Sequence, residues 1–113
     1  MKVIRTAIIA LVASVIFFLP KMAYAIDVSM GSGGNLIFEP SNVTINAGDT
    51  VHFVNDMLPP HNIIVEGRAD LSRESLMFNP GESQDIIFAD AGDYTFFCGP
   101  HQGAGMTGTI HVN

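Results

Sequence analysis

The sequence predicts an all-β protein, an antiparallel Greek-key β-sandwich of about eight strands in a single domain. Short runs of apolar or alternating residues follow one another along the chain, and turn-forming clusters separate them at 31–34, 46–49, 79–82 and 90–93. No helical periodicity lasts long enough to compete with this pattern. The prolines from Pro40 onward all fall outside the runs, as the hydrogen-bond ladder of a sheet requires.

Residues 1–25 have the features of a secretory signal peptide. A basic start precedes an apolar run over 7–19, and the small residues Ala23 and Ala25 frame a cleavage site. The apolar run is shorter than a bilayer-spanning helix, so an uncleaved membrane anchor is the less favoured interpretation. Cleavage after Ala25 would leave residues 26–113 as one small domain.

Eight segments of that domain follow the strand pattern: 26–30, 35–39, 42–46, 50–55, 62–66, 84–89, 93–98 and 107–113. In the seventh of these, Tyr94, Phe96 and Cys98 share one face, because side chains alternate along a strand. If that face belongs to the core, Cys98 points inward and Phe97 points outward. The remaining segment, 67–77, predicts a helical turn or an irregular loop.

The charge of the chain is strongly acidic. Its formal net charge is −6, and beyond the leader only Arg68 and Arg73 oppose the eleven carboxylates. A protein of this charge is expected to be repelled by nucleic acid and by anionic lipid and attracted to basic protein surfaces. The alternative is that the charge only keeps a small exported protein soluble, and net charge alone does not distinguish the two.

Cys98 is the single cysteine, and it cannot form an internal disulfide in an exported protein. His101 and Met106 follow it on a glycine-rich loop, in the pattern Cys-x2-His-x4-Met. A thiolate and an imidazole suit copper in both oxidation states, and a thioether suits a weak axial position. The loop therefore predicts part of a copper site that needs one more nitrogen donor.

Three other histidines could supply that nitrogen. His52 and His111 alternate with apolar neighbours and are expected to face outward. His61 follows two prolines that stiffen the approach, and it opens the next strand. The predicted metal ligands are therefore His61, Cys98, His101 and Met106.

Other functions fit these residues less well. A structural zinc site would require a further cysteine or histidine ligand at the position of Met106. Four protein donors leave no open position for a substrate, so the chain is predicted not to be an enzyme. A cysteine hydrolase would need a helix N-terminus or an oxyanion hole beside Cys98, and neither is evident. A copper-delivery module and a metal-free scaffold stay open as alternatives.

Three segments resemble the plastocyanin family of small blue copper proteins: AGDTVHFVN at 47–55, PPHN at 59–62 and DYTFFCGPHQGAGMTGTIHVN at 93–113. The resemblance covers essentially all of residues 26–113 and is of the cyanobacterial precursor type. It implies a cupredoxin-like sandwich and one copper ion, Cu(I) or Cu(II). The implied ligands are the same four residues, with Met106 as the long axial one.

The resemblance also implies a function. It is that of a soluble one-electron carrier between cytochrome f of the cytochrome b6f complex and photosystem I, which a monomer would meet transiently in the thylakoid lumen. The alternative is a pseudoazurin-like copper electron donor in a bacterial periplasm, because pseudoazurins share the spacing of the ligand loop. An apolar docking patch around His101 is implied, with these members: Leu36, Leu58, Pro59, Pro60, Gly103 and Ala104.

One residue matches the family pattern, and two others depart from it. Asn62 resembles the family residue that ties the two ligand loops together by hydrogen bonds. Phe97 stands where tyrosine is usual, and Gln102 stands where many cyanobacterial members have arginine. The chain is also slightly short, with the shortening expected in 66–79, where plant members carry part of an acidic patch.

Overall fold

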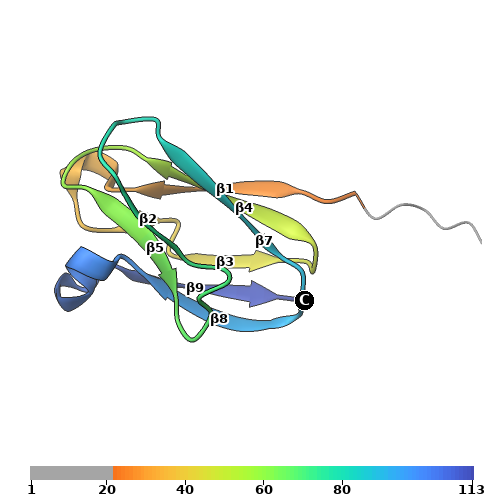
Figure 1. The fold of residues 1–113 in the computed structure, drawn as a ribbon. Helices are drawn as coiled ribbons and strands as arrows, with labels where there is room; N and C mark the ends of the chain where they lie inside the picture. The colour runs from red at the N-terminus through yellow and green to blue at the C-terminus, as the bar shows by residue number, and fades with distance from the viewer. Residues whose placement is uncertain (1–21) are drawn as a thin grey trace, which may run out of the picture.

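Two sheets pack face to face in the computed structural model, which describes residues 22–113 (Figure 1). One sheet has the strand order β2-β1-β4-β7, and the other has the order β3-β9-β8-β5-β6. The predicted β-sandwich is confirmed. The strands are β1 (Ala25–Met30), β2 (Phe38–Glu39), β3 (Asn42–Ile45), β4 (Asp49–Asn55), β5 (His61–Val65), β6 (Arg73–Met77), β7 (Ser83–Phe88), β8 (Gly92–Phe97) and β9 (Thr107–Val112). Two short 3-10 helices are η1 (Ser32–Gly34) and η2 (Gly99–Ala104).

The pairing of the strands is mixed, which corrects the prediction of an entirely antiparallel sandwich. β1 pairs with β4 in parallel, and β3 pairs with β9 in parallel. The other pairings are antiparallel, including the central pair of β8 and β9. Alternation of side chains reveals that a segment is a strand, but it contains no information on the direction of its partner.

β6 is the strand that the sequence analysis missed, since it lies within 67–77, where a turn or loop was predicted. It is the edge strand of its sheet, and Met77 is its one fully buried residue. Its pairing with β5 also shifts register between His61 and Ile63. An exposed edge strand has no apolar alternation, so the pattern on which the other strands were predicted is missing here.

Aromatic side chains fill the centre between the sheets. Phe38, Phe53 and Phe96 form a triangle of edge-to-face contacts, with ring centroids 4.7 to 6.2 Å apart. All three are almost fully buried, and burying such a side chain contributes about 1.5–3 kcal/mol to stability. Phe96 faces the core and Phe97 is half-buried on the outer side, as the alternation predicted.

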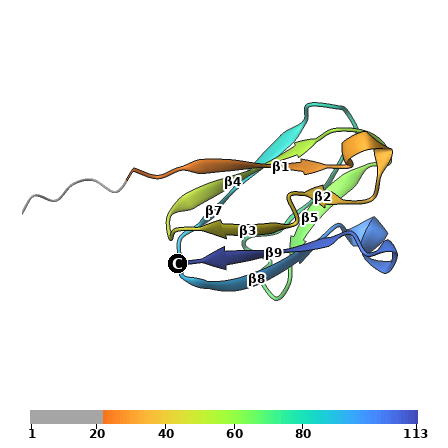
Figure 2. The same cartoon turned by 180° about the vertical axis from the view of Figure 1, so that it is seen from behind.

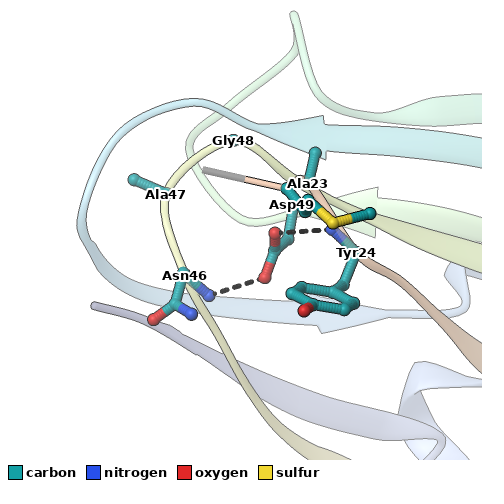
Figure 3. Close-up of a pocket in the computed structure, with 7 residues that line it drawn as sticks. Ala23, Tyr24, Asn46, Ala47, Gly48 and Asp49 are labelled. Atoms are coloured by element: carbon teal, nitrogen blue, oxygen red, sulfur yellow. Dashed lines mark hydrogen bonds between the residues drawn. The ribbon is translucent and has the colours of Figure 1, made fainter. Parts of the chain in front are cut away.

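The start of β1 and the C-terminus lie at the end of the sandwich that is remote from η2 (Figure 1). A pocket of about 280 Å³ is found there, and Figure 3 shows that the buried Asp49 side chain joins its two walls. The Asp49 carboxylate accepts hydrogen bonds from the backbone N–H groups of Tyr24, at 3.0 Å, and of Asn46, at 2.9 Å. These two bonds hold the pKa of Asp49 below its usual value. With both carboxylate oxygens engaged, Asp49 acts as an anchor for the start of β1.

The predicted signal peptide lies largely outside the described residues, since 1–21 are not among them. Ala25, its last residue, opens β1 and pairs with Thr50. Cleavage after Ala25 stays a prediction. Within residues 22–113, no helix combines the length and the apolar character that crossing a membrane requires.

Both arginines of the described residues are engaged within the fold. Arg68 donates two hydrogen bonds to the Asp70 carboxylate, at 3.0 and 2.9 Å, and its guanidinium lies 5.8 Å from the centroid of the Tyr94 ring. Arg73 donates to the backbone carbonyl of Asp85 at 3.0 Å, which connects the edge strands β6 and β7. Within residues 22–113, the other surface carboxylates therefore receive no arginine partner.

His52 and His111 lie on outer faces of the sandwich, as predicted. The His52 ring contacts the Asp85 carboxylate, and the His111 ring contacts the Asp93 carboxylate. The hydrogen bond and the negative charge of Asp93 raise the pKa of His111 above its ordinary value. Protonation of His111 is therefore favoured by folding.

We expect the Asp93→Asn substitution to lower the pKa of His111 toward about 6.5, the value of a free imidazole. Because the folded-state pKa is raised, the stabilisation by Asp93 is complete below that unfolded value and is lost as pH rises through the folded one. NMR titration of the ring protons measures the pKa, and unfolding at pH 5.5 and pH 8.5 measures stability. A variant that is destabilised equally at both pH values would contradict the prediction.

Candidate metal centre

The four predicted ligands come from one end of the sandwich, where η2 lies beyond the ends of β8 and β9 (Figure 2). His61 is the first residue of β5, which confirms the prediction that it opens a strand. Cys98 directly follows β8, and His101 lies in η2. Met106 stands between η2 and β9.

Backbone hydrogen bonds close the loop that carries three of these residues. The Cys98 N–H donates to the Met106 carbonyl at 3.0 Å, and the Met106 N–H donates to the His101 carbonyl at 3.3 Å. The His101 N–H donates to the Cys98 carbonyl at 3.1 Å. Gly105, in the left-handed region at φ +85°, allows the chain to turn from η2 into β9. The loop is therefore held at its ends by the two central strands of the sheet.

The side chains of His61, Cys98 and His101 converge. The Cys98 Sγ lies 3.3 Å from Nδ1 of His101 and 3.7 Å from Nδ1 of His61. Among residues 22–113, this is the one group of three such side chains whose donor atoms all lie within 4.8 Å of one another. His61 and Cys98 are fully buried, whereas His101 is half-exposed.

The electrostatics favour the neutral forms of Cys98 and His61 until a metal binds. Burial raises the pKa of the Cys98 thiol, and the backbone N–H groups of Asn62 and His101 act in the opposite direction. Burial, followed by the nearby His101, lowers the pKa of His61, while the Met57 carbonyl opposes this shift. A metal that binds here must displace the thiol proton, whereas the lowered pKa of His61 reduces competition from a proton on its ring. One thiolate and two imidazoles form a donor set that fits copper.

Met106 is fully buried against the same core as Cys98. Its backbone is bonded to both Cys98 and His101. The fold thus brings all four sequence-predicted residues to one place. The three that converge through their side chains are His61, Cys98 and His101.

Comparison with known proteins agrees with this geometry. Residues 24–113 match the model of a family described as copper binding proteins, plastocyanin/azurin family. The chain belongs to this family. Copper is its cofactor, as the sequence predicted.

Individual relatives place the chain more closely within the plastocyanin/azurin family. It is 41% identical to plastocyanin from Nostoc punctiforme over 120 aligned residues, which cover 93% of this chain and 86% of the relative. The solved structure of oxidised plastocyanin from Dryopteris crassirhizoma is 31% identical with a TM-score of 0.70, and covers 78% of this chain and 100% of its own. The solved structure of pseudoazurin from Methylobacterium extorquens is 25% identical with a TM-score of 0.60. The match covers 79% of this chain and 75% of the pseudoazurin chain. The predicted resemblance to plastocyanins is confirmed.

Asn62 ties the two ligand segments of this plastocyanin/azurin family member together, as predicted. Its Oδ1 accepts the Gly99 N–H at 2.7 Å, and its Nδ2 donates to the Glu74 carbonyl at 3.0 Å. The residue that follows His61 is thereby bonded to the residue that follows Cys98. Sequence reasoning missed the Glu74 end of this link because β6 was predicted as a loop.

We expect Asn62→Leu to destabilise the copper-free protein by about 1–3 kcal/mol, because it leaves the Gly99 N–H and the Glu74 carbonyl without their partner. Denaturant unfolding measures the change. Asn42→Leu is the matched control, since Asn42 is exposed and accepts a single bond, from the Thr109 hydroxyl. Equal destabilisation by the two variants would show that the Asn62 link has no special role.

Proposed function

We propose that the protein is a soluble one-electron carrier with a blue (type 1) copper site held by His61, Cys98, His101 and, more weakly, Met106. The observation that carries the proposal is the convergence of one thiol and two imidazole nitrogens within 4.8 Å in a largely buried cluster. When bound, copper supplies one-electron chemistry by alternating between Cu(I) and Cu(II).

The protein's own residues favour electron transfer over a reaction on a substrate. Backbone bonds within the ligand loop and the Asn62 link hold the donors in nearly fixed positions. A fixed donor set limits the rearrangement that accompanies each change of oxidation state. His61, Cys98 and Met106 are fully buried, so they leave little room for a substrate to approach.

His101 provides the route by which electrons enter or leave. It is the one of the four proposed ligands with access to solvent. Leu58 is 57% exposed, and Gly103 and Ala104 are exposed on the loop that carries His101. Small and apolar residues around an exposed ligand allow a partner to approach closely without displacing strongly bound water.

The proposed electron donor is cytochrome f of the cytochrome b6f complex, and the proposed acceptor is photosystem I, in the thylakoid lumen. The similarity to plastocyanins supports this choice, and so does the greater similarity to them than to pseudoazurin. The acidic surface favours basic docking faces and interactions that weaken as salt is added.

A visible absorption spectrum of the copper-loaded, oxidised protein tests the proposal. We expect an intense red-region band that bleaches on titration with one electron equivalent of reductant and returns on reoxidation. Weak absorption together with rapid loss of copper to a chelator would instead favour a copper-delivery protein. A protein that binds no copper would refute both. Reduction of the blue form by cytochrome f, slowed by added salt, tests the proposed donor.

A further inference from the structure

We propose that Gly31 is a positioning residue for His61, and this inference rests on the proposed copper function. Gly31 directly follows β1 and is buried. Its backbone packs against the edge of the His61 ring that faces away from Cys98. The absence of a side chain at position 31 would thus determine where the ring lies within the metal centre.

The space at Gly31 is too small for any side chain. A Cβ atom added there would lie 2.5 Å from Nε2 and 3.2 Å from Cδ2 of His61, and 2.8 Å from the Met57 carbonyl oxygen. Contacts under 3.0 Å are essentially never seen for real Cβ atoms. Gly31 therefore forms a wall that touches both the imidazole and the carbonyl beside it.

Neither side of this contact can move freely. The Gly31 N–H donates to the Ile37 carbonyl at 3.0 Å, and the Gly31 carbonyl accepts the Gly34 N–H at 2.9 Å. On the other side, the Nδ1 edge of the fully buried His61 ring lies against the Cys98 Sγ. The ring is thus confined between the Gly31 backbone and the other donor atoms.

Nε2 is the atom through which this contact acts on the centre. It is buried and has no hydrogen-bond partner of acceptable geometry among the described residues. The Met57 carbonyl is the polar group that acts on His61 at this edge of the ring, but without an aligned hydrogen bond it leaves the tilt of the ring open. Steric contact with Gly31 acts beside this carbonyl and limits the direction in which Nδ1 points.

Gly34 offers a matched control in the same turn. Its φ is +77°, close to the +80° of Gly31, so alanine is similarly strained at either position. A Cβ atom at Gly34 would meet no other atom within 4 Å. Any difference between Gly31→Ala and Gly34→Ala therefore reports the contact with His61 and Met57 rather than backbone strain.

The experiment compares both variants with the parent chain, loaded with copper. We expect Gly31→Ala to shift the visible and EPR spectra and the reduction potential, and to weaken copper binding by about 10–100-fold, the usual range for loss of support around a metal ligand. Gly34→Ala should lose stability but keep the spectra, the potential and the affinity of the parent. A folded Gly31→Ala variant whose spectra and potential equal those of Gly34→Ala would overturn the proposal.

NMR on the zinc-loaded parent chain provides a measurement that does not depend on whether Gly31→Ala folds. Contacts between the Gly31 Hα protons and the His61 Hε2 and Hδ2 protons should give strong cross-peaks, and Hε2 should exchange slowly with water. Missing cross-peaks would refute the inference. A parent chain that lacks a blue band would refute the proposed function, and the cross-peaks would still decide the position of His61.

Discussion

Replacing Cys98 with serine is expected to abolish the intense visible absorption of the copper-loaded protein completely. The band depends on a thiolate bound to copper, and Cys98 is the one cysteine of the chain. A serine hydroxyl in its place cannot supply that thiolate. Titration of the variant with Cu(II), followed by absorption spectroscopy, measures the effect. A retained blue band would show that Cys98 is not a ligand.

The same variant should stay folded, because serine is close to cysteine in size and the loop is held by backbone bonds that do not involve the sulfur. Circular dichroism and the unfolding transition of the copper-free protein check this expectation. Thr107→Ser, at the exposed first residue of β9, introduces a serine beside the ligand loop while the sulfur stays in place, and it should leave the band unchanged.

Replacing Phe96 with alanine is expected to give a larger loss of stability than the other substitutions considered, about 3–5 kcal/mol. The ring is fully buried and lies 4.7 Å from Phe38 and 5.4 Å from Phe53, measured between centroids. Its removal leaves a cavity where the two sheets meet. Because a small domain has a total stability of about 5–15 kcal/mol, much of it would be lost.

Phe78→Ala is the matched control, since Phe78 is 54% exposed. Its effect should stay within about 0.5 kcal/mol, as for most surface positions. Denaturant unfolding of the copper-free forms measures both variants. A loss of under 1 kcal/mol for Phe96→Ala would mean that the core closes around the missing ring and that the aromatic triangle contributes little.

Strands and metal ligands could be predicted where the evidence lies in residues close together in the sequence. Alternation along 93–98 placed Cys98 inward and Phe97 outward, as the structure shows. Cys98, His101 and Met106 lie on one short loop, so they are close together in space in any fold that the chain adopts. His61 could be singled out because prolines and a strand start are visible in the sequence itself.

Features that depend on distant contacts were not predictable. β6 lies at a sheet edge, so its exposed residues carry no alternating pattern. The parallel pairings of β1 with β4 and of β3 with β9 depend on how the chain crosses between sheets. The approach of Gly31 to His61 joins residues thirty positions apart, and from the sequence that glycine signals a turn and nothing more.

The engagement of Arg68 and Arg73 within the fold bears on how copies of this protein behave toward one another. Within residues 22–113, Asp70 and the Asp85 carbonyl hold the two guanidinium groups, so this part of the chain presents carboxylates and no free arginine to a second copy that collides with it. Mutual repulsion of this kind opposes clustering. In a concentrated solution, each copy would then keep its half-exposed His101 ring free for the basic partner surface that we propose.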